Sequence, residues 1–147
     1  MSAANQRPCF GGTKLCLFDQ SNRLVIPAKF RVGFEDVVYL YRDARSNCLV
    51  VYTEEDYFKF YARLAESYTG AELHSVQDYV EANIFHSALD KAGRITITDE
   101  LMNILGLTDK KEARVVRTPE RLEIWDEEVW QQKLAKASEL DLSRIVI

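Results

Sequence analysis

One stretch of this chain occurs twice, and the duplication limits the folds that the chain can adopt. Residues 18–31 read FDQSNRLVIPAKFR and residues 89–102 read LDKAGRITITDELM. An offset of 71 residues places the Asp of one copy on the Asp of the other, and Arg on Arg. A second pair of similar segments, 49–55 and 122–128, follows at an offset of 73. Two copies are too few for a solenoid, so the sequence predicts a domain of two related halves with a pseudo-two-fold axis.

Each copy contains an Asp four residues before an Arg, in Asp19–Arg23 and in Asp90–Arg94. An apolar strand precedes each of these segments and another follows it, so both are predicted to be turns. Asn22 and Gly93 occupy the matching turn position, and both residue types tolerate a positive φ. The Asp can therefore reach the guanidinium across the turn. Two interpretations remain open: an ion pair that braces a hairpin, or an Arg held ready for a phosphate or a base edge.

Apolar periodicity and turn residues along the chain predict a β-rich α+β fold. The predicted strands are residues 10–18, 24–26, 37–41, 48–52, 85–89, 95–97, 113–117 and 121–125. The predicted helices are residues 28–34, 53–67, 75–84, 99–105 and 126–137. Helix N-caps are expected at Thr53, at Thr98 or Asp99, and at Asp126.

A formal net charge of −4 by itself disfavours a nucleic-acid partner, but the charge is distributed unevenly. Residues 1–31 sum to +4 and the remaining residues to −8. This distribution fits one basic face on an acidic body, and it fits chance scatter in a short segment equally well. No apolar run is long enough to span a membrane, and the first residues lack the apolar region of a signal peptide. Residues 1–8 are expected to be a short disordered lead.

Three cysteines are few and odd in number, which indicates a reducing cytosol rather than a disulfide framework. Neither the cysteines nor His74 and His86 have the spacing of metal ligands. Phosphate-binding loops and nucleophile motifs are also missing from the sequence. Cys16 could be a nucleophile, although a cysteine within a strand is more often a small core residue. We therefore expect no enzyme activity, no metal and no cofactor.

With both Asp-x-x-x-Arg segments, with IPAKFR after the first and with EIWDEEVW after the second, the chain resembles the MraZ family. The resemblance extends from Cys9 to Leu134. It implies a swapped-hairpin, AbrB-like double-split β-barrel with short peripheral helices. The implied divisions are an extension at 1–8, a first AbrB-like half at 9–70, a linker helix at 71–83, a second half at 84–137 and a tail at 138–147. Together these form one intertwined domain.

The resemblance also implies a function. Proteins of this family assemble into rings and regulate transcription of the division and cell-wall gene cluster by binding short direct DNA repeats. The implied DNA-reading residue is Arg23, which Asp19 would orient. We expect Lys14, Lys29 and Arg31 to steer and hold phosphates. We expect Asp90 and Arg94, in the less basic half, to be a structural pair. The expected partners are double-stranded DNA and further copies of the chain, not a membrane, in the cytoplasm at the nucleoid.

The chain departs from the family pattern at several positions. Ser21 and Asn22 stand where the family usually has Lys and Gly, and Gly11 stands where a basic residue often precedes Gly12. In the second copy Thr98 replaces a Pro and Met102 replaces an Arg. Each lost cation removes one possible phosphate contact and should reduce the salt dependence of DNA binding.

Two other classes of function are also considered. The acidic second half and the apolar tail suggest a protein-interaction or antidote-like module on the same fold, without specific DNA binding. A small hydrolase or thiol enzyme that uses Cys16 is disfavoured, because the sequence shows no base to activate the thiol.

Overall fold

The structure is a computed structural model in which residues 11–147 are described. The predicted lead at residues 1–8 and Cys9 lie outside the described residues. The strands are β1 (Thr13–Leu17), β2 (Arg23–Val25), β3 (Val37–Asp43), β4 (Cys48–Tyr52), β5 (Ile84–Ala88), β6 (Arg94–Thr96), β7 (Glu112–Arg117) and β8 (Leu122–Trp125). The helices are α1 (Glu54–Ser67), α2 (Gly70–Asn83), α3 (Asp99–Ile104) and α4 (Glu127–Ser138), with two short 3-10 helices, η2 (Ala28–Phe30) and η3 (Leu142–Arg144). The predicted combination of many strands with a few helices is confirmed.

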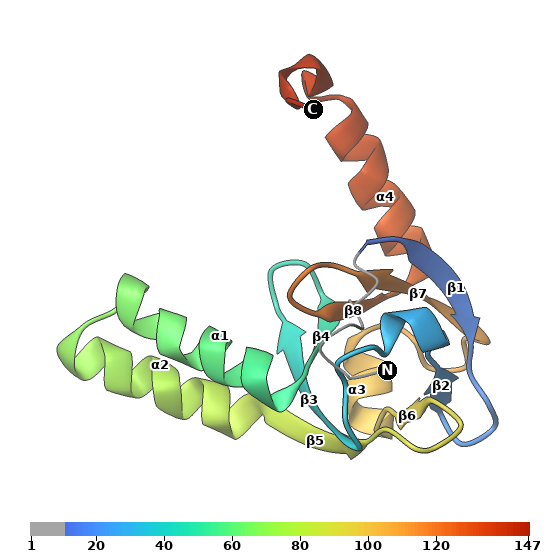
Figure 1. Cartoon of the computed structure of the whole chain (residues 1–147), viewed down its shortest axis with the longest axis horizontal. Coiled ribbons are helices and arrows are strands. Elements are labelled where there is room, and N and C mark those ends of the chain that lie inside the picture. The colour runs from blue at the N-terminus through green and yellow to red at the C-terminus, as the bar shows by residue number, and fades with distance from the viewer. Residues whose placement is uncertain (1–10) are drawn as a thin grey trace, which may run out of the picture.

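Six strands form an antiparallel sheet in the order β1-β7-β8-β4-β3-β5 (Figure 1). The order reads the same in reverse when each strand is replaced by its counterpart in the other half, β1 by β5, β3 by β7 and β4 by β8. The first strand of each half pairs with the hairpin of the other half, β1 with β7 and β5 with β3. The two halves therefore share one sheet, and each supplies an edge strand to the other.

The strands β2 and β6 form a separate two-stranded antiparallel ribbon, in which Leu24 lies opposite Ile95. A single bridge from Phe18 to Leu24 joins the end of β1 to the ribbon, and a bridge from Leu89 to Ile95 does the same for β5. Within residues 11–147 the six-stranded sheet itself is not closed into a barrel. The ribbon is thus joined to the two edge strands of the sheet, β1 and β5, by one residue pair at each edge.

The sheet is buried on both faces, which explains why β4 and β8 are buried along their whole length. One apolar cluster joins the sheet to the ribbon, η2 and α3; it includes Leu24, Ile26, Phe30, Ile95, Ile97, Leu101, Met102, Leu107 and Ile124. The other lies under α1, α2 and α4; it includes Val50, Tyr52, Tyr57, Val80, Val116, Trp125 and Trp130. The long helices therefore cover one face, and the duplicated turns lie on the other side of the molecule (Figure 1).

The predicted helix starts are confirmed by side-chain caps. Thr53 Oγ1 accepts a hydrogen bond from the Asp56 N–H at 3.0 Å, and Thr98 Oγ1 accepts one from the Leu101 N–H at 3.3 Å. Asp126 Oδ2 accepts one from the Val129 N–H at 3.1 Å. Each cap satisfies an N–H group that has no partner within its helix.

Two helix predictions were wrong in extent. The predicted helix 28–34 is only the 3-10 turn Ala28–Phe30, and Gly33 then adopts a φ of +93°, which no α-helix accommodates. The helix predicted to start at Ser75 begins at Gly70 instead. The residues just after Gly70 (Ala, Glu and Leu) are strong helix formers, which accounts for the additional turn. The longer helix packs along α1 as a hairpin that projects from the sheet (Figure 1).

The helix α4 projects in a different direction from the α1–α2 hairpin and carries the C-terminal residues away from the sheet (Figure 1). Its first turn is tied to β7 by a two-pronged contact. Arg114 Nε and Nη2 donate to the two oxygens of Glu127, both at 2.7 Å. Among residues 11–147, no helix has the length and apolar character needed to cross a membrane.

We predict that Glu127→Gln destabilises the protein by about 1 kcal/mol, because the ion pair with Arg114 is lost and the amide offers one acceptor oxygen in place of the carboxylate's two. Urea unfolding followed by tryptophan fluorescence measures this change, since Trp130 lies in the same helix. Glu128→Gln is the matched control: it removes the same charge from the same helical turn at an exposed residue. Equal losses of stability in Glu127→Gln and Glu128→Gln would show that the contact between Arg114 and Glu127 does not stabilise the protein.

Candidate nucleic-acid interface

The two duplicated turns have nearly identical hydrogen bonding. Asp19 Oδ1 accepts from the Ser21 N–H at 2.8 Å and from the Arg23 N–H at 3.0 Å, and Oδ2 accepts from Arg23 Nε at 2.7 Å. In the second turn Asp90 accepts from the corresponding residues Ala92 and Arg94, at 2.9 Å from both N–H groups and at 2.8 Å from Arg94 Nε. One carboxylate thus fixes both the backbone of the turn and the orientation of the guanidinium.

The turn position occupied by Asn22 and Gly93 adopts a positive φ in both copies, +59° and +82° respectively, as the sequence predicted. Asn22 makes an additional contact that the sequence did not reveal. Its Nδ2 donates to Asp99 Oδ1, at the start of α3, at 2.6 Å. The side chain therefore ties the first turn to a helix of the second half.

The two turns also brace each other across the ribbon. The Ile26 N–H donates to the Gly93 carbonyl at 2.8 Å, and the Ile97 N–H donates to the Asn22 carbonyl at 3.0 Å. In addition, Arg94 Nη1 lies 3.9 Å from Asp19 Oδ2, the same oxygen that holds Arg23. The turns consequently lie side by side with a fixed mutual geometry.

The electrostatics of the two turns are alike. Partial desolvation raises the pKa of Asp19, but hydrogen bonds from the Arg23 and Ser21 N–H groups and from the Arg23 guanidinium outweigh it and hold the pKa below 3.8. The hydrogen bond from the Arg94 N–H, aided by the Arg94 side chain, likewise lowers the pKa of Asp90. The side chains of Arg23 and Arg94 are 36% and 33% exposed. Each Arg uses Nε internally; the outer nitrogens of Arg23 make no hydrogen bond within residues 11–147, whereas Arg94 Nη1 also faces Asp19 Oδ2 at 3.9 Å.

The other predicted phosphate contacts lie on β1, on η2 and just after η2. Lys14 is exposed on β1, and Lys29 is exposed on η2 with its Nζ 5.4 Å from the centre of the Phe30 ring. Arg31 follows η2 and lies against the second turn, where a Cβ built on Gly93 would meet its Cζ at 2.4 Å. The sequence suggested no such contact, because it joins a residue of one half to the turn of the other.

The residues predicted for other chemistry are not arranged for it. Burial raises the pKa of the Cys16 thiol, which makes it a poor nucleophile. Burial also raises the pKa of Cys48, to about 12. In the part of the chain that the structure describes, no three His, Cys, Asp or Glu residues are grouped to hold a metal ion.

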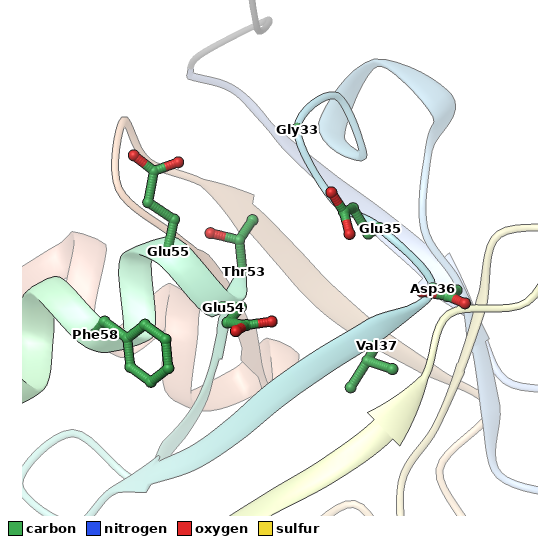
Figure 2. A pocket seen from close by; sticks show the side chains of 8 residues that line it. All are labelled: Gly33, Glu35, Asp36, Val37, Thr53, Glu54, Glu55 and Phe58. Carbon is green, nitrogen blue, oxygen red and sulfur yellow. The ribbon is translucent and has the colours of Figure 1, made fainter.

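A hollow of about 450 Å³ beside the start of α1 is acidic (Figure 2). Its lining includes the carboxylates of Glu35, Asp36, Glu54 and Glu55, with Phe58 on the helix next to them. No cation is among the residues that line it, so it would repel a phosphate backbone. The paired turns are therefore better suited to bind DNA than this hollow.

Comparison with known proteins points in the same direction. The family model described as "MraZ protein, putative antitoxin-like" matches residues 9–77 and 82–146. A relative from Kocuria rhizophila named "Transcriptional regulator MraZ" is 37% identical over 132 residues, 85% of this chain and 86% of its own. Relatives of the same name from Nocardioides sp. and Saccharopolyspora erythraea are 34% and 33% identical, with 90% and 88% of this chain and 93% and 90% of theirs covered.

We predict that Asn22→Ala lowers the free energy of unfolding by about 1 kcal/mol, because alanine is strained at positive φ and cannot bond Asp99. Asn22→Gly should cost less than half as much, because glycine adopts this φ freely. Urea unfolding of the two variants measures the difference. A glycine variant as unstable as the alanine variant would show that backbone strain does not matter at this turn.

A second prediction concerns the stability of the protein at low pH. Because the folded pKa values of Asp19 and Asp90 lie below 3.8, their stabilising contribution is complete above that pH and is lost as the pH falls through the lowered values. The urea midpoint of the native chain should therefore fall more steeply than that of an Asp19→Asn, Asp90→Asn double variant as the pH drops below about 4. If the urea midpoints of the native chain and the double variant fall in parallel with pH, this prediction is wrong.

Proposed function

The chain belongs to the MraZ family, and we propose that it is a transcriptional regulator that binds short direct repeats of double-stranded DNA sequence-specifically. The observation that carries this proposal is the Asp19-anchored Arg23. Its guanidinium is oriented before binding, and its outer nitrogens make no hydrogen bond within residues 11–147. An orientation fixed in advance reduces the entropy lost on binding.

Arg23 is the residue that we assign to base reading. A guanidinium fork matches O6 and N7 of guanine in the major groove and is the commonest specific contact of its kind. Asp19 holds Nε, which leaves the terminal edge of the fork for two parallel hydrogen bonds to the base. Lys14 and Lys29 are exposed on neighbouring elements and are assigned to the phosphate backbone.

The affinity of a single protomer would be low, because the chain carries a net charge of −4 and its basic residues are few. We propose that several protomers bind several repeats at once as a ring-shaped homo-oligomer, so that avidity supplies the affinity. The C-terminal tail supports self-association: Leu140, Leu142, Ile145, Val146 and Ile147 are all exposed beyond α4.

We further propose that the exchanged strands and the bridged ribbon form the swapped-hairpin, AbrB-like double-split β-barrel that the resemblance implies. The pairing of each first strand with the opposite hairpin supports this assignment. The target would be the division and cell-wall gene cluster, and the protein would act in the cytoplasm at the nucleoid. The rival function, an antidote-like module that binds a protein partner, would not require a DNA-reading Arg23.

The test is fluorescence anisotropy with the DNA upstream of the protein's own gene, against a scrambled duplex, over a salt series. We expect tight, steeply salt-dependent binding to the upstream duplex and a loss of about tenfold or more in Arg23→Ala, with little change for the scrambled duplex. Lys59→Ala is the control, since Lys59 pairs with Glu55 on α1. Weak binding to both duplexes, or an Arg23→Ala variant that binds as the native chain does, would contradict the proposal.

A further inference from the structure

The segment that follows α4 is exposed and largely apolar, and residues 139–147 are called the C-terminal segment below. The exposed fraction of its side chains is 67% at Leu140, 65% at Ile145 and 93% at Val146. A run of exposed apolar residues with polar residues beside them is typical of an interaction site. Nothing within residues 11–147 covers these side chains, so the C-terminal segment is a candidate for docking on another molecule.

The C-terminal segment already has a defined local structure. Asp141 Oδ1 accepts a hydrogen bond from the Ser143 N–H at 3.1 Å and so caps the 3-10 helix η3. At the other end of η3, the Ile145 N–H donates to the Leu142 carbonyl at 3.1 Å. A segment that is ordered before it binds loses less conformational entropy on binding.

A hollow of about 500 Å³ between the α1–α2 hairpin and the sheet is called the hairpin groove below. Its walls are mainly aromatic and aliphatic, and they include Tyr41, Tyr52, Phe60, Leu64, Tyr68 and Tyr79. The centre of the Phe60 ring lies 5.3 Å from that of Tyr52 and 5.5 Å from that of Tyr41, so the walls are packed against one another. Tyr79 is nevertheless 56% exposed. The hairpin groove therefore offers apolar surface to an apolar guest.

The charged side chains that line the hairpin groove favour an acidic guest. Arg121 is already paired with a carboxylate of β8. Arg45 is 94% exposed, and its Nε lies 4.0 Å from Asp43. Arg45 also lines an adjoining hollow together with Lys133 and Lys136, and no carboxylate is among the described residues that line that second hollow. Arg45 is thus the cation most accessible to a guest in the groove.

The C-terminal segment has the complementary character. It carries Glu139 and Asp141 against Arg144 alone, and Asp141 lies among its apolar residues. The groove of the same protomer is not within its reach, because α4 carries the segment away from the sheet while the α1–α2 hairpin projects in a different direction (Figure 1). The molecule that receives the C-terminal segment is consequently a second copy of the chain.

We propose that the C-terminal segment of one protomer docks in the hairpin groove of a second copy, with Ile145 and Val146 against the aromatic walls and Asp141 facing Arg45. The proposal rests on the proposed function, in which the protomers form a ring, and it names the surfaces that would hold them together. Donor and acceptor are different parts of the chain, so the contact is heterologous. A heterologous contact repeats from one protomer to the next and closes into a ring where the rotation allows it.

Light scattering coupled to size exclusion, over a concentration series of the full chain, measures the assembly. An Ile145→Ser, Val146→Ser double variant should raise the dissociation constant between protomers by about tenfold or more, because two apolar side chains lose their burial. Ser75→Trp should do the same, because Ser75 is exposed and lines the groove, which an indole would fill. The controls, Leu134→Ser on α4 and His74→Trp on α2, are exposed outside both surfaces and should assemble as the native chain does.

A mixing experiment tests whether the two surfaces bind each other. The serine double variant keeps an intact hairpin groove, and Ser75→Trp keeps an intact C-terminal segment. An equimolar mixture therefore holds one competent donor and one competent acceptor, and it should give a particle with the mass of two protomers. Neither variant should reach that mass alone. A mixture that stays monomeric would refute the pairing of the segment with the groove.

A charge exchange tests the contact between Arg45 and Asp141. Arg45→Glu should weaken assembly by about fivefold at low salt, because it places two carboxylates opposite each other. Asp141→Lys should also weaken assembly, but the double variant should recover part of the loss. Losses that simply add in the double variant would refute this contact.

Two outcomes separate the docking from the proposed function. If the native chain assembles and binds the upstream duplex, and if the serine double variant and Ser75→Trp assemble equally well, the docking is refuted while the proposed function stands. If the native chain stays monomeric at every concentration, the proposed ring fails and the docking fails with it.

Discussion

The arrangement of this protein depends on one carboxylate that accepts three hydrogen bonds. Asp19 orders its turn by binding two backbone N–H groups, and it anchors Arg23 with its second oxygen. The strand β2 begins at that same Arg, so the interaction that starts a strand also orients a cation. Asp90 does the same for β6. Because turn, strand and guanidinium are fixed by one group, changes elsewhere in the fold need not disturb the site.

Duplication then places two such turns together. Each half gives its first strand to the opposite hairpin, so both edges of the sheet are formed by exchange. The ribbon between β2 and β6 lies on the axis of this exchange and brings the turns into contact through Ile26 and Ile97. The helices α1, α2 and α4 bury the other face of the sheet. A compact pair of turns thus remains on the side of the sheet that these helices do not cover.

The sequence predicted those structural features that depend only on residues close to one another along the chain. The positive φ of Asn22 and the cap at Thr53 follow from residues no more than four positions apart, and both are present. Helix extent was less predictable, since Gly33 shortened one helix and Gly70 opened another. The contact between Arg31 and Gly93 could not be derived from local patterns, because it forms only once the halves have exchanged strands.

The two turns share one backbone geometry but differ in the residue at the positive-φ position, Asn22 in the first and Gly93 in the second. Backbone geometry is kept by the Asp and the positive-φ residue, so that residue is free to be Gly or Asn without loss of the turn. The choice decides whether a side chain from the other half can lie on the backbone. Gly93 admits the guanidinium of Arg31, whereas the Asn22 side chain donates a hydrogen bond to Asp99. One Cβ therefore decides whether a cation from the other half can lie against the backbone of the turn.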